Sequence, residues 1–365
     1  MLDLSAAFDL LSPKLLVKKL KVYGLETCFI SWIESYLSKR FQCVWIDHIY
    51  STLLANETGV PQGSLLGPLL FLIFFNDLPC YVSQDMDCYA DDSNMTSSGT
   101  SVVDIGHLMN KDCDQVRIWT LSNKLKLNAE KTKVMLLGTS TKLETTDIPL
   151  EVEMAGVKLN QTTETSVMLL GIHIQSNLKW SEQISYLASK LQARLSSLEK
   201  LRYVLTRRNR VMIVEGVFNS VLCYCLPVFG GCGQSQIDKL QTVQNRAARL
   251  ALRCPPRSHR DWMFDNLEWL TVVQLIAYHT LVMVFRIRSN RTPEYLYSKL
   301  CRDSRQGRII IENNHLDIYR KSFIFRGATL WNKLPTVIRE MENIGPFKQS
   351  TKAWILKNVE RFRIS

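Results

Sequence analysis

The start of the chain has the pattern of two short helices. Ser12 and Pro13 precede a stretch rich in leucine and lysine, and Gly24 follows it. Serine is favoured at a helix N-cap, proline in the first turn and glycine just beyond the last turn. We therefore expect a helix between Ser12 and Gly24, and apolar spacing predicts a second one over residues 28–37.

Strand-like and loop-like segments come next. Residues 41–46 and 52–54 are rich in β-branched, aromatic and other apolar side chains, which favours strands. Residues 59–64, with two glycines and a proline, predict a loop. The apolar run at residues 65–75 is too short to span a membrane, so we expect a buried helix there.

A second β-rich region surrounds a pair of aspartates. Residues 86–90 predict a strand that turns at Asp91 and Asp92 and returns, which forms a hairpin with an acidic tip. Helices mixed with mostly antiparallel strands indicate an α+β domain over roughly the first 180 residues. The pattern further predicts a helix at residues 103–121 and strands at residues 133–137 and 167–174.

From about Trp180 onward the pattern becomes helical. A stripe of apolar residues recurs at helical spacing. Pro255 and Pro256 form the clearest break, helices follow near residues 267–287, and a loop-rich region leads to an amphipathic helix at residues 347–359. The stripe consists of Ile184, Leu187, Leu191, Leu195 and Leu198.

Charge adds a preference for a polyanionic partner. The net charge is +11, and residues 190–210 hold seven basic side chains against one acidic side chain, Glu199. A basic protein without a nucleic-acid role has the same balance, so charge alone leaves that alternative open.

The cysteines argue against a metal ribbon. Ten cysteines are scattered along the chain, and no spacing matches a zinc ribbon or knuckle with partner histidines. No secretory signal is present, so we expect reduced thiols and a nuclear or cytoplasmic protein that is not secreted.

Three aspartates have the chemistry of a metal-dependent transferase. Nucleotidyl transfer needs mainly positioning and charge neutralisation, commonly by two Mg²⁺ ions about 4 Å apart. Mg²⁺ prefers oxygen ligands, so carboxylates must converge from separate segments. Asp3 near the start and Asp91 with Asp92 at the expected hairpin tip provide such carboxylates. Taken singly, each is more often a solvated surface residue.

The ordered motifs resemble those of reverse transcriptases, in the branch of non-LTR (LINE-type, jockey- or CR1-like) retrotransposons. Asp3 to Asp9 resembles motif A, residues 59–64 with Gly67 and Pro68 resemble motif B, and residues 89–92 resemble motif C. Further similar segments extend almost to the C-terminus. They are residues 32–40, 76–78, 127–133 (motif D), 170–180 (motif E), 244–249, 267–270 and 325–335.

The resemblance implies roles for the residues at the motif positions. Asp3, Asp91 and Asp92 are the catalytic and metal-binding carboxylates, with Asp92 as the auxiliary acid. The implied cofactor is a pair of Mg²⁺ ions, with Mn²⁺ as an alternative.

The nucleotide is expected to meet a second group of side chains. Phe8 stands where the family has a steric gate that favours dNTPs. The alternative is a phenylalanine that packs in the core, and both roles could hold. Gln62 and Gly63 would line the nucleotide and template base. Lys131 or Lys133 would approach the pyrophosphate, unless these lysines are simply solvated.

The implied nucleic-acid contacts lie in the helical region. Its basic side chains would contact the phosphates of an RNA template and a DNA primer without sequence preference. For any one of them, an ordinary solvated face is the alternative. The expected contacts are Lys190, Arg194, Arg207, Arg208, Arg210, Arg246 and Arg249.

The resemblance also predicts the organisation of the chain. We expect a right-hand polymerase palm, an antiparallel sheet with packed helices, over residues 1–180. A helical, basic, thumb-like region would span residues 181–256, and a helical and loop-rich region residues 257–365. Only Met1 and Leu2 precede Asp3, so we expect an N-terminally truncated chain without the fingers subdomain.

Two functions compete on this basis. The first is an RNA-directed DNA polymerase core that adds dNTPs to a primer 3′-OH. The second is an inactive retrotransposon remnant that at most binds nucleic acid. A weaker third hypothesis is a host protein that reuses the fold for binding. No membrane partner is expected, and the sequence identifies no protein partner.

Overall fold

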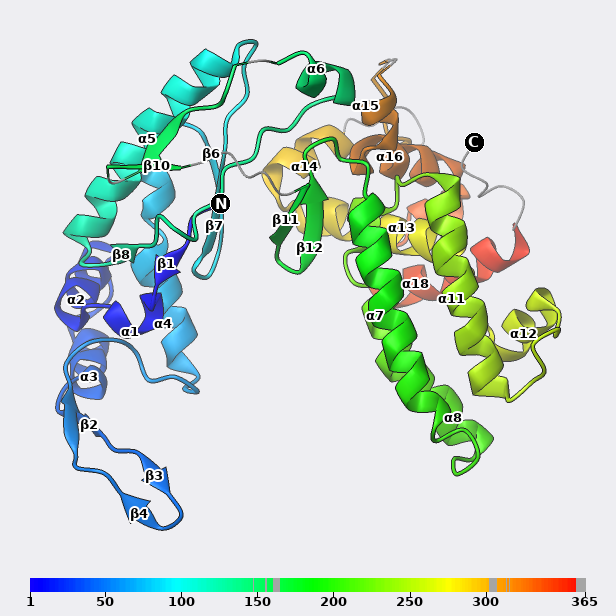
Figure 1. Ribbon diagram of the computed structural model, residues 1–365, viewed down its shortest axis with the longest axis horizontal. Coiled ribbons are helices and arrows are strands. Elements are labelled where there is room, and N and C mark those ends of the chain that lie inside the picture. The colour runs from blue at the N-terminus through cyan, green and yellow to red at the C-terminus, as the bar shows by residue number, and fades with distance from the viewer. Residues whose placement is uncertain are drawn as a thin grey trace. The chain divides into compact units, whose positions relative to one another are not determined.

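The computed structural model forms two compact units, Met1–Leu170 and Gly171–Ser365, which are coloured blue to green and green to red in Figure 1. The expected three-part division stays a prediction. The described residues are 1–146, 148–154, 156–159, 165–301, 307–312, 314 and 316–358.

A small antiparallel sheet lies at the centre of the first unit. Strands β6 (Asp85–Tyr89) and β7 (Asp92–Thr96) form a hairpin, and β1 (Leu4–Ser5) pairs with β8 (Lys126–Leu127). An antiparallel bridge between Leu2 and Ser93 joins the two pairs. The order across this sheet is therefore β6, β7, β1, β8, and the predicted acidic hairpin is confirmed.

Helices pack beside this sheet and form its core. The predicted helices are confirmed as α2 (Pro13–Val22), α3 (Thr27–Leu37), α4 (Leu66–Phe75) and α5 (Val102–Ser122). Phe71, Phe74 and Trp119 are fully buried among them. The first unit is thus a mixed helix and strand fold, as expected for an α+β domain.

A partly buried polar network ties three of these helices together beside the apolar core. Lys19 of α2 donates to Asp77 Oδ1 at 2.7 Å and to the Phe74 carbonyl at 2.6 Å. Trp119 Nε1 of α5 donates to the same Asp77 oxygen at 3.0 Å. Burial lowers the pKa of Lys19, and the bond to Asp77 opposes this shift. Asp77, which follows α4, therefore holds α2 and α5 against the end of that helix.

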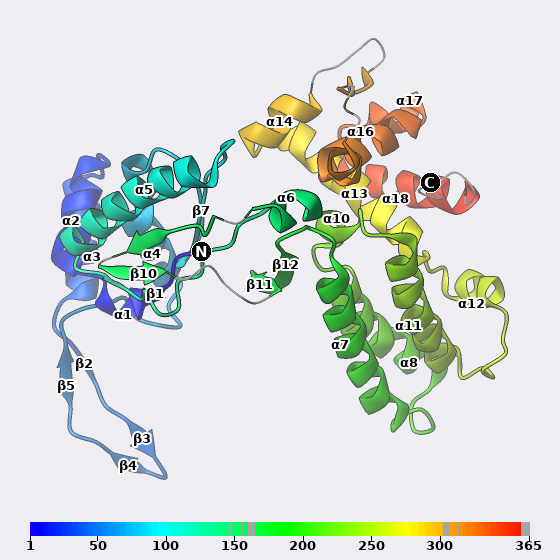
Figure 2. The same cartoon turned by 45° about the horizontal axis from the view of Figure 1, so that its top comes forward.

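A long β-ribbon extends from the end of α3 (Figure 2). It consists of β2 (Arg40–Gln42), β3 (Trp45–Ile46), β4 (Ile49–Tyr50) and β5 (Leu54–Asn56), paired as two successive antiparallel ladders. The strands predicted near residues 41–54 are therefore confirmed. Their large apolar side chains are mostly exposed.

Two further expectations for the first unit need correction. The helix α4 is buried on one side only, because Leu65, Leu69 and Leu72 are exposed at 98%, 52% and 52%. Residues 133–137 are irregular apart from a single bridge residue, Val134, and do not form the predicted strand. The unit also contains α1 (Ala7–Leu10), the 3-10 helix η1 (Leu78–Tyr81), α6 (Ser140–Glu144), β9 (Val152–Met154), β10 (Val157–Leu159) and β11 (Ser166–Leu169).

The second unit begins with β12 (Ile172–Gln175) and continues as helices. The predicted apolar stripe belongs to α7 (Ser181–Glu199), which packs against α11 (Gln234–Leu252). Four of its five residues are buried, and Leu198 is partly buried against the same core. Between these helices lie α8 (Arg207–Val214), the π-helical turn η2 (Glu215–Asn219), α9 (Ser220–Leu222) and α10 (Leu226–Phe229).

The helix α13 (Val272–Asn290) is the central core helix of this unit. Pro255 and Pro256 separate α11 from α12 (Arg260–Leu267), as predicted. The stretch Arg260–Asn290 is long and apolar enough for a membrane span by composition, and 61% of that apolar window is buried inside the protein. Such burial is what a core helix requires.

The C-terminal part is more helical than expected. Its described residues form α14 (Glu294–Leu300), α15 (Asp317–Lys321), α16 (Phe323–Lys333), α17 (Thr336–Arg339) and α18 (Ile344–Lys357). The predicted amphipathic helix corresponds to α18, and its expected last residue, Val359, lies outside the described residues.

Candidate active site

The tip of the β6–β7 hairpin holds two of the three candidate carboxylates. The turn consists of Ala90 and Asp91, and Ala90 has a positive φ of 56°. Tight hairpin turns commonly need such a backbone conformation, which a non-glycine residue adopts at some cost. Asp91 thus stands in the turn itself, and Asp92 is the first residue of the returning strand.

The third carboxylate lies on the neighbouring strand. Leu2 is paired with Ser93, and the Leu2 N–H donates to the Ser93 carbonyl at 2.8 Å. In an antiparallel register this places Asp3 opposite Asp92. Side chains alternate along a strand, and Leu2 and Ser93 point into the protein at 7% and 2% exposure. Asp3 and Asp92 therefore share the other face.

The electrostatics agree with this register. Partial burial raises the pKa of the Asp92 carboxyl, and the negative charges of Asp91 and Asp3 raise it further. Like charges close together favour protonation of one of them. A divalent cation beside these carboxylates would remove the repulsion, and their hard oxygen donors suit Mg²⁺.

The carboxylates do not form a ready-made cage. Within the described ranges, no three His, Cys, Asp or Glu side chains are grouped closely enough to hold one metal ion. A cation here would need oxygens from outside the protein as well, which is usual for Mg²⁺. The donor chemistry and the register therefore fit the ions, while a metal centre itself stays a prediction.

The loop at residues 59–64 is fixed to the short helix α1. The Gly59 N–H donates to the Leu11 carbonyl at 2.7 Å, and the Val60 N–H donates to the Phe8 carbonyl at 3.1 Å. Arg40 Nη1 donates to the Gly59 carbonyl at 3.2 Å. The segments expected as motifs A and B are therefore joined through their backbones.

Within this loop, Gln62 and Gly63 are exposed. Gln62 Nε2 donates to Asp9 Oδ1 at 2.9 Å. Gly63 has a φ of +79° and open space where a Cβ would stand. The loop therefore leaves room for a ligand beside Gly63, as the sequence suggested, while its contact with a nucleotide stays a prediction.

Phe8 packs against the aromatic side chains of α4. Its ring stacks on Phe71 of α4, with 4.1 Å between centroids. Phe71 stacks in turn on Phe75. Phe8 is only partly buried, so its packing leaves the steric-gate prediction open.

The segment at residues 128–133 is docked on the strand that carries Asp3. The Asn128 N–H donates to the Asp3 carbonyl at 2.9 Å, and the Asp3 N–H donates to Thr132 Oγ1 at 3.3 Å. Lys131 is exposed and Lys133 is partly buried. The segment thus holds the strand of Asp3 in place, which the sequence did not suggest for Thr132.

The sequence predicted no role for three residues that shape this site, namely Gly59, Asp9 and Arg40. A Cβ on Gly59 would stand 2.9 Å from the Asp9 Cα, the Asp9 carbonyl and the Phe8 carbonyl, so only glycine fits there. Asp9 and Arg40 were each part of a quoted motif, but a lone charged residue gives no sign of its partner. For Gly59, the available signal was its place as the first glycine of a Gly-x-x-x-Gly loop.

The basic residues of α7 and α8 are not all at the surface. Lys190 is exposed beside Tyr186, whose ring centroid is 5.3 Å from Nζ. Arg207 and Arg208 are exposed, whereas Arg194 Nη1 donates to the Val217 carbonyl in the π-helical turn at 2.7 Å. Arg194 therefore holds the chain where η2 departs from α-helical geometry.

Arg210 lies in the interior. It is 8% exposed and donates to the carbonyls of Leu205 and Ala251 at 2.6 and 3.3 Å. Burial lowers its pKa, and the charges of Arg253, Arg202 and Arg207 lower it further. These bonds occupy the guanidinium inside the protein.

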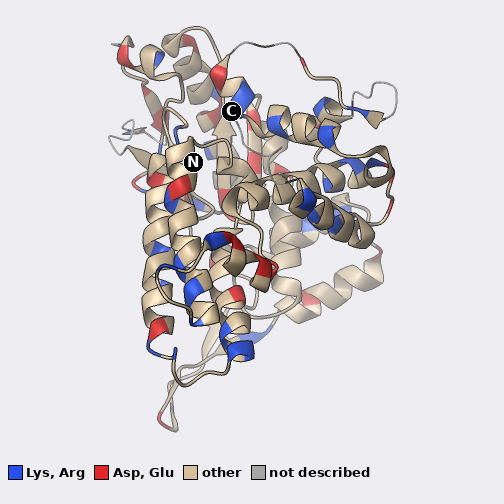
Figure 3. Cartoon of the chain, turned by 90° about the vertical axis from the view of Figure 1, so that its right-hand side faces the viewer, with Lys and Arg blue, Asp and Glu red and all other residues tan. Residues whose placement is uncertain are grey.

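Arg246 joins α11 to α7. It forms two hydrogen bonds to Glu199, at 3.0 and 2.9 Å, and a third to Ser196. The bond to Arg246 is the main cause that lowers the pKa of Glu199. Arg249 is half-buried, with an Nε that lacks a partner. Figure 3 shows the positions of Lys and Arg spread over several helices.

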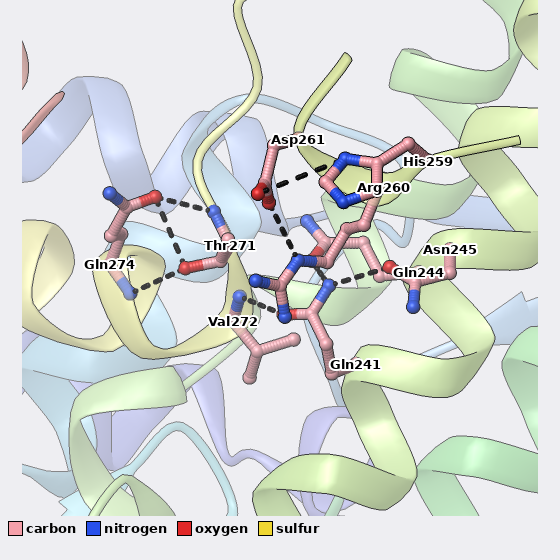
Figure 4. Close-up of polar contacts among 9 residues, drawn as sticks. All are labelled: Gln241, Gln244, Asn245, His259, Arg260, Asp261, Thr271, Val272 and Gln274. Carbon is pink, nitrogen blue, oxygen red and sulfur yellow. Dashed lines mark hydrogen bonds and ion pairs between the residues drawn. The ribbon is translucent and has the colours of Figure 1, made fainter. Parts of the chain in front are cut away.

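The remaining motif residues of α11 form a polar network at the start of α13 (Figure 4). Gln241 accepts the Val272 N–H at 2.9 Å and donates to Asn245 at 2.9 Å. Gln244, which is 1% exposed, donates to the Leu270 carbonyl. Thr271 and Gln274 complete a capping box on α13. This motif is therefore structural.

The Trp331-Asn332 motif, for which the sequence offered no role, is structural as well. Trp331 is 2% exposed, stacks on Phe347 and donates to the Gly307 carbonyl at 3.1 Å. Asn332 accepts the Ile309 N–H and donates to its carbonyl, both at 2.8 Å. The side-chain amide of Asn332 thus bonds to both backbone groups of Ile309, as the backbone of a neighbouring strand would.

Arg326 anchors the same helix to an earlier part of the unit. It is 6% exposed and donates through Nη2 to the Pro227 carbonyl and through Nε to the Lys321 carbonyl. Burial lowers its pKa to about 10.

All ten cysteines are free thiols, and burial raises the pKa of Cys113 and Cys223 to about 11.

Comparison with known proteins identifies the family. A family model described as reverse transcriptase (RNA-dependent DNA polymerase) matches residues 1–191. In Drosophila melanogaster, the probable RNA-directed DNA polymerase from transposon BS is 27% identical over 305 residues, 80% of this chain and 33% of that protein. The RNA-directed DNA polymerase from mobile element jockey is 26% identical over 263 residues, 68% of this chain and 27% of that protein.

A third relative agrees with these two. The probable RNA-directed DNA polymerase from the X-element transposon of Drosophila melanogaster is 25% identical over 287 residues, 76% of this chain and 31% of that protein. The chain spans about a third of the length of these relatives. The predicted resemblance to reverse transcriptases of mobile elements is confirmed. Because the family model covers more than half of the 365 residues, the chain belongs to the reverse transcriptase (RNA-dependent DNA polymerase) family.

Proposed function

We propose that this chain is the nucleotidyl-transfer core of an RNA-directed DNA polymerase. It would add dNTPs to the 3′-OH of a DNA primer on an RNA template. The observation that carries the proposal is the register that sets Asp3 opposite Asp92, beside Asp91 at the hairpin tip. The raised pKa of Asp92 supports the proximity of all three.

In the proposed reaction, Asp3 and Asp91 would hold two Mg²⁺ or Mn²⁺ ions, and Asp92 would add negative charge beside them. Such ions stabilise the attacking and leaving oxygens of an in-line displacement. The protein aligns the primer hydroxyl and the triphosphate, and pyrophosphate leaves. Gln62 and Gly63 line the nucleotide, and Phe8 excludes a ribose 2′-hydroxyl. Lys131 or Lys133 approaches the pyrophosphate.

The template–primer would contact the second unit through exposed basic side chains. We assign phosphate contacts to Lys190, Arg207 and Arg208, which are exposed. Arg194, Arg210 and Arg246 hold other protein groups. Their contacts with phosphate would require these bonds to break. Binding should be independent of sequence and weakened by salt.

Primer extension on an RNA template tests the proposal. With Mg²⁺, the wild-type chain should extend the primer only in the presence of matching dNTPs. Asp91→Asn should reduce the rate on the order of 100- to 1,000-fold, as loss of a group that stabilises transition-state charge does. Asp104→Asn, an exposed aspartate in the first turn of α5, is the matched control and should leave the rate unchanged. A folded wild-type chain that fails to extend any primer would favour the inactive remnant instead.

A further inference from the structure

The side chain of Gln62 has one defined partner, and that partner lies on the other motif. Gln62 Nε2 donates to Asp9 Oδ1 at 2.9 Å, across 53 residues of sequence. Both side chains are exposed, so neither is needed to fill the core. A polar contact between two exposed residues of the site calls for a functional explanation.

The backbones of the two segments that carry Gln62 and Asp9 are joined beneath this contact. Gly59 lies against the backbone of Asp9, with no room for a side chain. The loop and the α1 segment are also linked by the bonds from Gly59 to Leu11 and from Val60 to Phe8. The Phe8 ring is held on Phe71 of α4. Asp9 and Gln62 therefore lie on two segments that are joined by backbone hydrogen bonds and by the packing of Phe8 on Phe71.

The chemistry of the two groups fixes the direction of the amide. A carboxylate only accepts hydrogen bonds, whereas a primary amide has an accepting oxygen and a donating nitrogen. Turning the amide over would set Oε1 of Gln62 against the Asp9 carboxylate, with two acceptors facing each other. Asp9 therefore selects one of the two amide orientations and leaves Oε1 and the second N–H free to meet a ligand.

We propose that Asp9 is a positioning residue that presents the amide of Gln62 to the nucleotide and its template base in one orientation. The inference rests on the proposed polymerase function, because Gln62 is the expected nucleotide contact. Asp9 acts through Gln62 and needs no contact with the reacting atoms. An exposed carboxylate bonded without consequence is the alternative that an experiment must separate from this role.

Steady-state incorporation of one dNTP provides the first test. Asp9→Ala should raise KM for the dNTP about 5- to 10-fold, as loss of one well-placed hydrogen bond does, with kcat within about 2-fold. Asp9→Asn should give an intermediate KM, because its amide can bond to Gln62 in either orientation. In a Gln62→Ala background, Asp9→Ala should add nothing.

A second test does not depend on activity. In a chain labelled with ¹⁵N only at glutamine, the side-chain signal that disappears in Gln62→Ala belongs to Gln62. Asp9→Asn should shift this signal, since the amide loses its charged acceptor. Asp104→Asn, the matched exposed aspartate, should leave it in place.

The outcomes separate the inference from the proposed function. An inactive wild-type chain overturns the polymerase function, whatever the amide spectra show. An active chain whose KM is unchanged in Asp9→Ala overturns the positioning role. An equal rise in KM with and without Gln62, or an amide signal that is indifferent to Asp9, overturns it as well.

Discussion

The two units use their sequence motifs in opposite ways. In the first unit, the motif side chains Asp91, Asp92 and Gln62 are exposed or partly exposed around a small sheet. In the second unit, the motif side chains Gln244, Arg326 and Trp331 are at most 6% exposed and bond to backbone carbonyls. These motif side chains are therefore accessible in the first unit, whereas those of the second unit serve its architecture.

The difference lies in how the buried polar groups of each unit find their hydrogen-bond partners. A buried polar side chain must find a partner, because an unpaired one costs about 1–3 kcal/mol. The second unit meets this demand with glutamine, arginine and asparagine side chains that bond to otherwise open carbonyls. The first unit has such side-chain bonds as well, around Asp77, but its loop at residues 59–64 is held mainly by backbone bonds, which leaves the Gln62 side chain exposed. The expected effects below run from the largest to the smallest.

Trp331→Ala should destabilise the second unit and have the largest effect on the free energy of unfolding. Removing this buried ring from its stack on Phe347 should lower the free energy of unfolding by about 3–5 kcal/mol. Thermal unfolding followed by tryptophan fluorescence or circular dichroism would measure the loss. An unchanged melting temperature would show that this motif does not serve the architecture.

Gly59→Ala and Gly63→Ala form a matched pair in the first unit. Both glycines have a positive φ, but only Gly59 lacks space for a Cβ. Gly59→Ala should cost about 3 kcal/mol, because strain adds to a clash with the backbone of Asp9. Gly63→Ala should cost about 1 kcal/mol from the backbone conformation alone. Equal costs in denaturant unfolding would refute the docking of the loop on α1.

Arg207 and Arg246 distinguish surface contacts from internal bonds. Arg207→Ala should reduce the slope of log affinity against log salt for template–primer by about 1, as loss of one phosphate contact does. Arg246→Ala should leave that slope unchanged and lower stability by about 0.5 kcal/mol, because its pair with Glu199 is exposed to solvent. A lower slope in Arg246→Ala would move this residue to the nucleic-acid surface.

The pH dependence of Asp92 is the smallest expected effect. Its folded pKa is raised, so the protonated form is favoured by folding. The contribution is complete below the ordinary aspartate pKa of about 3.9 and is lost as pH rises through the raised value. At neutral pH, Asp92→Asn should therefore stabilise the chain, by no more than about 0.5 kcal/mol since solvent screens an exposed carboxylate. Destabilisation at pH 7 would contradict the repulsion among the three aspartates.

Much of the fold followed from local pattern. Helices α2 and α5 were predicted within one or two residues, and the apolar stripe of α7 was recognised, because apolar spacing and the residues that begin and end a helix are local properties. The hairpin of β6 and β7 was predicted for the same reason. The ribbon of β2 to β5 was also located, by its β-rich composition, but the exposure of its side chains was not predicted, because the spacing of apolar residues does not reveal what covers a strand.

Less of the site could be predicted. The aspartates were found because hard-oxygen chemistry demands such residues, but the pairing of Leu2 with Ser93 is a contact across 91 residues that no local pattern encodes. Arg194 and Arg210 resembled surface charges and proved to bond to carbonyls. The sequence shows that a guanidinium is present and cannot show which carbonyls lack a partner around it.

Metal binding tests the central claim most directly. Manganese should be titrated into the chain with a dideoxy-terminated primer, an RNA template and the next dNTP, and the free ion followed by electron paramagnetic resonance. About two Mn²⁺ ions should bind per chain, as two-metal transfer requires. Asp3→Asn and Asp91→Asn should each lose at least one of them, and Asp104→Asn should lose none. The same number of bound ions in all four proteins would contradict the assignment of these carboxylates.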